Sequence, residues 1–181
     1  GISEKTIEEH LKLYSGYVKN VNGLVDKLAI MQKAENADAY TIAELRRRIG
    51  FEFNGMRLHE YYFENLGGDG SNLSATALSS LIETQYDGFD KWLVEFKNAG
   101  MARGIGWVIL YYDPSIKKLH NVWITDHEVG HLAGLPIILA MDVWEHAYLL
   151  DYLPSQRKDY IEAFFSNVNW GVVEERFVKA R

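Results

Sequence analysis

The sequence contains no cysteine, and this absence excludes more chemistry than any other feature of its composition. Disulfide frameworks, zinc–thiolate sites, iron–sulfur clusters and cysteine nucleophiles all require thiols. Any metal ion that this chain binds must therefore be held by nitrogen and oxygen atoms. Six histidines are available to supply the nitrogen: His10, His59, His120, His127, His131 and His146.

Long apolar runs and an excess of positive charge are also missing. The longest strongly apolar stretch, 135–141, is far shorter than the roughly 18 residues of a membrane span. The formal net charge is −6, whereas nucleic-acid-binding proteins usually carry a basic excess. A charged-then-apolar leader is not seen at the amino terminus. We therefore expect a cytoplasmic protein that binds neither a membrane nor nucleic acid.

The first part of the chain reads as two amphipathic helices. Thr6 with Glu9, and Thr41 with Glu44, form capping-box patterns that predict two helix starts. Apolar residues recur at helical spacing after both starts, and neither helix can bury its apolar face alone. An antiparallel helical hairpin is therefore expected. A glycine-rich segment then predicts a domain boundary, and the two expected domains are 1–70 and 71–181.

The second part predicts an α+β domain, with helices around a three-stranded antiparallel sheet. Segments 107–112 and 119–125 are rich in β-branched and aromatic residues, and Asp113–Ser115 between them reads as a turn, so a β-hairpin is expected. The fully apolar stretch 135–141 predicts a third strand at the centre of the sheet. Helices are expected over 75–97, 142–152, 156–165 and 171–179.

His10 and His59 fall on the apolar faces of the two hairpin helices, where leucine would be expected. A buried imidazole needs partners for its ring nitrogens, because each unmet polar group costs about 1–3 kcal/mol. Either histidine alone is explained by a hydrogen bond to a backbone carbonyl. Both together raise the question of a shared partner.

Asp142 and His146 suggest what that partner is. They are four residues apart on a predicted helix and so project from one face. Asp142 could simply cap this helix, with Glu145 completing a capping box. It also directly follows an apolar strand, and a buried carboxylate there needs a cation or several donors. Together with the two core histidines, the pair indicates a site of three His and one Asp, which suits iron, manganese or zinc.

Longer motifs around these residues resemble the iron/manganese superoxide dismutase family. The segment Asp142–Tyr148, DVWEHAY, is similar to the family's signature around its last two metal ligands. The resemblance extends over about residues 2–177. Four further segments resemble the family in its own order: 2–10, 58–63, 104–107 and 157–177.

The resemblance implies an antioxidant enzyme that converts two superoxide anions to dioxygen and hydrogen peroxide by redox cycling of iron or manganese. Superoxide would reach the metal past Tyr17, which here follows the first ligand by seven residues, whereas the family usually has eight. A solvent molecule would occupy the fifth position on the metal. The implied ligands of one ion per chain are His10, His59, Asp142 and His146.

In the family, a hydrogen bond to that solvent molecule tunes the metal. One family position for the donor corresponds to Gly55, which has no side chain. The other corresponds to His127, which is therefore predicted to be the donor and not an exposed loop histidine. The space left at Gly55 favours this role. Histidine at this place is common among iron-using members, so we favour iron and keep manganese open.

The resemblance also implies a homodimer or a higher homo-oligomer. Glu145 would pair with the metal-binding histidine of the other subunit. Tyr14 and Leu149 stand where the family usually has His and Tyr, so the link that those residues make between subunits is expected to be lost. Three tryptophans are predicted to lie around the site: Trp107, Trp144 and Trp170. Arg157 is predicted to supply positive charge at its mouth. The remaining histidines, His120 and His131, are predicted to be structural or surface residues.

Two other functions stay open on the residues alone. A hydrolase could use the same ligands on zinc, but it would need a general base and a substrate cleft. The aromatic residues around the predicted site suit a very small substrate better. A structural metal-binding protein without enzymatic activity is the second alternative.

Overall fold

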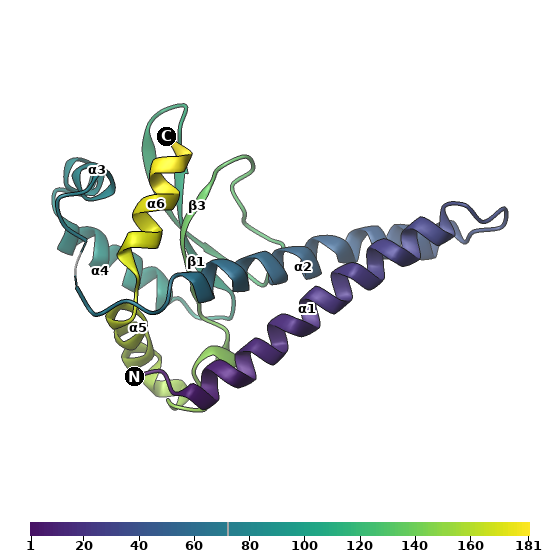
Figure 1. Ribbon diagram of the computed structural model, residues 1–181, viewed down its shortest axis with the longest axis horizontal. Coiled ribbons are helices and arrows are strands. Elements are labelled where there is room, and N and C mark those ends of the chain that lie inside the picture. The colour runs from purple at the N-terminus through teal and green to yellow at the C-terminus, as the bar shows by residue number, and fades with distance from the viewer. Residues whose placement is uncertain (72) are drawn as a thin grey trace.

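The structure is a computed structural model that describes residues 1–71 and 73–181, so Asn72 of the predicted boundary segment lies outside the described residues. Two long antiparallel helices, α1 (Glu4–Met31) and α2 (Ala39–Glu64), form an arm, and the rest of the chain packs at one end of it (Figure 1). The expected α+β class is confirmed, because the hairpin is followed by helices around a three-stranded antiparallel sheet.

Both hairpin helices begin earlier than the capping-box patterns predict. The caps are Ser3 and Asp38, whose side chains accept the backbone N–H of Thr6 at 3.2 Å and of Thr41 at 2.8 Å. The predicted caps Thr6 and Thr41 are therefore wrong, since both threonines already lie inside the first turn. Ser and Asp rank above Thr as N-cap residues, which explains why the earlier residue takes the position.

The single helix predicted over 75–97 is wrong. Two helices occupy this region, α3 (Ala77–Tyr86) and α4 (Phe89–Gly100). Between them Asp87 and Gly88 have φ values of 59° and 133°, which lie outside the range of a right-handed helix. An Asp-Gly pair is a turn signal, and the apolar residues on both of its sides concealed it.

The sheet has the strand order β2-β1-β3, built from β1 (Trp107–Asp113), β2 (Lys118–Ile124) and β3 (Ile137–Asp142). The predicted hairpin of the first two strands is confirmed. The prediction that the third strand is central is wrong, because β1 is central and β3 is an edge strand. The apolar sequence of β3 has another cause, since α2 and α6 (Trp170–Ala180) pack against it and bury it.

The segment predicted as a helix over 142–152 has a different structure. Asp142 ends strand β3, and the chain then forms a single 3-10 turn, η1 (Glu145–Ala147). Oδ1 of Asp142 accepts the backbone N–H of Trp144 at 2.8 Å, so this carboxylate closes a turn and does not cap a helix. The last two helices agree with prediction: after the 3-10 turn η2 (Pro154–Gln156) come α5 (Arg157–Ser166) and α6.

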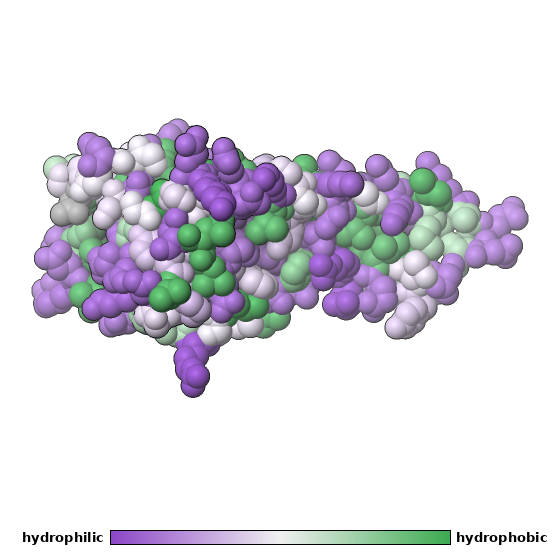
Figure 2. Space-filling view, turned by 90° about the horizontal axis from the view of Figure 1, so that it is seen from below, coloured by the Kyte–Doolittle hydropathy of each residue, from purple (hydrophilic) through white to green (hydrophobic). Residues whose placement is uncertain are grey.

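The free end of the arm carries exposed apolar residues. Val25, Ile30 and Tyr40 are 53%, 71% and 75% exposed. In Figure 2 hydrophobic side chains lie among hydrophilic ones along this part of the molecule. Across residues 1–71 and 73–181, the helices are all too short or too polar to cross a membrane.

Candidate metal centre

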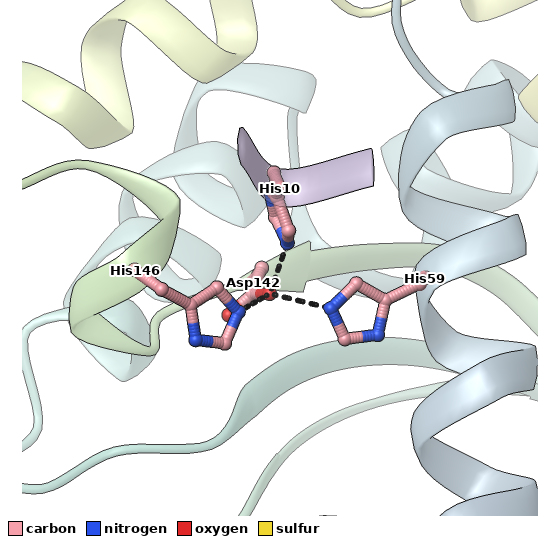
Figure 3. Close-up of side chains that lie close together, drawn as sticks. All are labelled: His10, His59, Asp142 and His146. Atoms are coloured by element: carbon pink, nitrogen blue, oxygen red, sulfur yellow. Dashed lines mark hydrogen bonds and ion pairs between the residues drawn. The ribbon is translucent and has the colours of Figure 1, made fainter. Parts of the chain in front are cut away.

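Four side chains from four elements meet where the arm joins the sheet (Figure 3). His10 comes from α1, His59 from α2, Asp142 from the end of β3 and His146 from η1. From Oδ2 of Asp142, Nε2 lies 3.1 Å away in His10, 3.2 Å in His146 and 3.9 Å in His59. Four donor atoms, one from each residue, lie within 4.8 Å of one another. The structure therefore brings together all four residues predicted as ligands.

These separations suit the ligands of a single ion. Metal–ligand bonds of about 2.0–2.2 Å place two donors of one ion about 3–4 Å apart. His10, His59 and Asp142 are fully buried, and the side chain of His146 is 22% exposed. A carboxylate and three imidazoles held this close in a protein interior form a favourable site for a cation.

His59 provides the most direct test of whether these residues fit a metal ion. Its Nδ1 lies 2.6 Å from the carbonyl oxygen of Gly55, and because a carbonyl only accepts, Nδ1 carries the proton. The lone pair on Nε2 is therefore free. Nε2 is buried, has no hydrogen-bond partner within the described part of the chain, and faces Asp142. Burial lowers the pKa of His59 to about 4, so the ring is neutral, as a ligand must be.

The carboxylate of Asp142 is held in one orientation. Oδ1 accepts the N–H of Trp144, which leaves Oδ2 directed at the histidines. Behind it, the Tyr160 hydroxyl donates to the backbone carbonyl of Asp142 at 2.7 Å. Burial would raise the pKa of Asp142, but the charge of His146 and hydrogen bonds from His10 and His146 outweigh it and hold the pKa below its ordinary value.

A hydrogen-bonded chain of three aromatic residues lies beside the cluster. The indole N–H of Trp107 donates to Nδ1 of His127 at 3.0 Å, and because an indole only donates, the proton of His127 sits on Nε2. Nε2 then donates to the hydroxyl of Tyr17 at 2.8 Å. Burial lowers the pKa of His127 to about 4 and raises that of Tyr17 to about 12. Both groups are neutral at pH 7. The single N–H of His127 is directed at Tyr17, so this ring has none left for the solvent molecule to which it was predicted to donate, whereas Tyr17 keeps its own proton to donate.

Gly55 makes room for the ring of Tyr17. A Cβ atom at this position would lie 2.7 Å from two carbons of the ring. The space expected to open at Gly55 is therefore filled by the ring of Tyr17, and His127 contacts the hydroxyl of this tyrosine. Sequence reasoning missed this packing role. The available signal was the glycine itself, since a glycine inside a helix costs about 0.5–1 kcal/mol relative to alanine.

Two of the three predicted tryptophans line the cluster. The ring of Trp107 lies edge-on to His59 at 5.1 Å between centroids. The ring of Trp144 stacks on His127 at 5.1 Å and on His146 at 5.8 Å. These rings pack against the imidazoles of His59, His127 and His146.

The structure does not bring Trp170 to the cluster. Its ring packs on Phe89 and Trp92 with centroids 5.5 and 6.0 Å away, inside the C-terminal core. The prediction that Trp170 lies at the site is therefore wrong. It rested on a family motif, and in this chain the residue belongs to the core.

Three predicted residues remain: Glu145, Tyr14 and Arg157. Glu145 is exposed in η1, next to His146. Tyr14 donates its hydroxyl proton to Glu60 at 3.1 Å. The Nη1 of Arg157 donates to a backbone carbonyl at 2.7 Å, and burial lowers the pKa of this guanidinium. Its contribution to charge at the mouth of the site stays a prediction.

Comparisons with known proteins place the chain in a family. The model of the alpha-hairpin domain of iron/manganese superoxide dismutases matches residues 1–67, and the model of their C-terminal domain matches 74–176. An iron superoxide dismutase of Cupriavidus metallidurans is 38% identical, over 99% of this chain and 90% of the relative. One of Saccharolobus solfataricus is 36% identical, over 98% of this chain and 86% of the relative. A manganese superoxide dismutase of Haloarcula marismortui is 36% identical, over 99% and 87%. The chain therefore belongs to the iron/manganese superoxide dismutase family.

Proposed function

We propose that this chain catalyses the dismutation of superoxide at one iron or manganese ion. Two superoxide anions and two protons give one dioxygen and one hydrogen peroxide. The chemistry that such an ion supplies when bound is one-electron transfer, alternately from and to superoxide. The ligands in this proposal are the four clustered side chains: His10, His59, Asp142 and His146.

The unpaired Nε2 of His59 is the observation that carries the proposal. A buried acceptor without a donor costs about 1–3 kcal/mol, and a metal ion removes that cost. Family membership favours superoxide dismutation over the two alternatives, the zinc hydrolase and the structural metal site.

Tyr17 and His127 would manage protons in this reaction. Peroxide leaves only after two protons arrive, and Tyr17 is a neutral donor whose ring lies 5.1 Å from that of His59. His127 directs the hydroxyl by donating to its oxygen, so the tyrosine proton stays free for the substrate or for solvent in the site. Because burial keeps both groups neutral, neither adds a charge that would repel or trap superoxide.

The choice of metal follows less directly from the residues, because both ions use the same ligands. We favour iron, since histidine in the place of His127 is common among iron-using members of the family. Relatives named for iron and for manganese are similarly related to this chain, at 36% identity in each of two cases. Manganese therefore stays open.

We also propose a homodimer, or a higher assembly that contains it. The carboxylate of Glu145 is exposed in this single chain, and it follows Trp144 directly at the edge of the cluster. Leu149 and Leu150, which follow closely, are 42% and 51% exposed, so a second copy would cover apolar surface there. Light scattering on the purified protein would give the mass of the assembly. A cytoplasmic location stays a prediction.

Metal analysis combined with a matched pair of variants tests the proposed function. The purified protein should contain about one iron or manganese ion per chain, and reconstitution with each metal should identify which one restores activity. His59→Ala should abolish metal binding and activity, while His120→Ala, a histidine of strand β2, should retain both. A wild-type protein without either metal, or a fully active His59→Ala variant, would overturn the proposal.

A further inference from the structure

His131, which was predicted to be structural or on the surface, has both of its ring nitrogens engaged in hydrogen bonds. Nε2 lies 2.8 Å from the backbone carbonyl oxygen of His127, and Nδ1 lies 2.7 Å from the hydroxyl of Tyr111. Because a carbonyl only accepts, Nε2 carries the proton and donates it. Nδ1 is therefore the acceptor of the tyrosine O–H. Both hydrogen bonds have a fixed direction.

The segment that this ring holds is the loop 125–136 between β2 and β3. An isolated bridge between Thr125 and Val129 crosses the loop, and Asp126 and Gly130 have positive φ values of 65° and 106°. A loop with so irregular a backbone derives its position from the contacts it makes with rigid elements.

Strand β1 supplies such an element at two points. Trp107 and Tyr111 are four residues apart on this strand, so their side chains leave the same face of the sheet. Trp107 binds the imidazole of His127 directly at 3.0 Å. Tyr111 reaches the backbone of His127 through the ring of His131. One strand therefore holds both the side chain and the main chain of His127.

We propose that His131 is a positioning residue for His127. His131 holds the backbone of residue 127 to strand β1. This keeps the imidazole of His127 aligned so that it can form its hydrogen bonds with Trp107 and with Tyr17 at the same time. The inference rests on the proposed role of His127 in the dismutase site. Partners outside the ligand shell of a metal site commonly affect activity by about 10–100-fold, and we expect about tenfold for this more distant residue.

The test uses the full chain loaded with Zn²⁺, which gives no paramagnetic broadening in NMR, and follows the exchange of tryptophan indole protons with solvent. In His131→Ala, exchange at Trp107 should accelerate by about tenfold or more, because its acceptor on His127 is no longer held. The indole of Trp92 donates to Asn121 at 3.0 Å elsewhere in the domain and serves as the internal reference. It should exchange at the wild-type rate.

His131→Gln is the rescue variant, since an amide can donate to the carbonyl and accept from Tyr111. It should restore slow exchange at Trp107 and most of the dismutase activity of the metal-reconstituted enzyme. Unchanged exchange at Trp107 in His131→Ala would overturn the proposal, and so would equal acceleration at Trp107 and Trp92, which would indicate general loosening. Because indole exchange does not measure activity, a failure of the proposed function is seen separately, as an inactive wild-type enzyme.

Discussion

The inner and outer sides of the metal centre differ in how completely the protein encloses them. On the inner side His10, His59 and Asp142 are fully buried. On the outer side His146 is 22% exposed and Glu145 is exposed. Burial keeps His59 neutral, and hydrogen bonds hold the direction of His59 and Asp142, whereas His146 and Glu145 remain open to solvent. The four clustered residues therefore span an enclosed side and a side that solvent can reach, and His146 lies on the second.

The inner side is further held by hydrogen bonds that reach away from the cluster. Nδ1 of His59 donates to the carbonyl of Gly55, and the backbone carbonyl of Asp142 accepts from Tyr160. The hydroxyl of Tyr160 also lies 3.3 Å from that of Tyr62, which is fully buried. Such partners orient metal ligands and keep them from rotating.

The largest effect is expected on the inner side, from Asp142→Asn. Asparagine keeps the shape and can still accept the N–H of Trp144, but it removes the negative charge that three imidazoles surround. Metal content and dismutase activity should both fall below detection. Asp113→Asn is the matched control, because Asp113 accepts the N–H of Ser115 at 2.9 Å in a similar turn far from the site. Metal retained in Asp142→Asn would show that the inner carboxylate is not a ligand.

The second prediction concerns pH and His127, which is as buried as the inner ligands. Its pKa is about 4 in the folded chain and about 6.5 when unfolded. As pH falls from 6.5 to 4, His127 becomes protonated in the unfolded chain but stays neutral in the folded chain. The free energy of unfolding therefore decreases. Above pH 6.5 this histidine contributes no pH dependence.

Between pH 7 and pH 4 the loss from this one histidine is about 3 kcal/mol, at about 1.4 kcal/mol per pKa unit. Denaturant unfolding of the metal-free chain at pH 7 and pH 4 would measure it. The wild type should lose that much more stability than His127→Gln over this interval. Equal losses in the two proteins would mean that His127 titrates normally and is not enclosed as the inner ligands are.

Gly55→Ala tests the boundary between the two sides. The added methyl group would displace the ring of Tyr17 and separate its hydroxyl from His127, so activity should fall by about tenfold with the metal retained. Gly50→Ala is the matched control in the same helix, because a Cβ there meets its nearest neighbour, Glu128, at an ordinary 3.7 Å. Full activity in Gly55→Ala would show that the position of Tyr17 does not matter.

The smallest effect is expected on the outer side, from Glu145→Gln. The exposed carboxylate should matter only where it meets a second subunit, so dimer dissociation should increase by several-fold while the metal content of the assembled protein stays the same. Glu175→Gln, an exposed helical glutamate paired with Lys179, is the control. Light scattering over a dilution series measures the difference. A dimer unaffected by Glu145→Gln would remove this residue from the interface.

Much of the fold and the four clustered residues could be predicted from local patterns. Helical periodicity located the hairpin and put His10 and His59 on its buried faces, and the alternation of β-branched and aromatic residues located the β-hairpin. Asp142 and His146 were predicted to lie close together on one helix. They do lie close together, but the predicted helix is wrong. A strand end followed by a 3-10 turn brings them as close as one helical turn would.

The failures occurred where a nearby competitor or a distant contact overrides the local signal. Ser3 and Asp38 cap the two helices in place of the predicted threonines, because each is a better N-cap residue and lies three residues before the threonine. The apolar composition of β3 indicated its burial, but composition does not distinguish a central strand from an edge strand that helices cover.

The sequence by itself therefore determined the family, the α+β class and the identity of the four clustered residues. Only the tertiary structure decided how the neighbouring groups act on them. The hydrogen bond between Tyr17 and His127 joins positions 110 residues apart, and the bond between Tyr111 and His131 spans 20. No local periodicity encodes such pairs, because their geometry exists only after the hairpin, the sheet and the loop 125–136 have packed together.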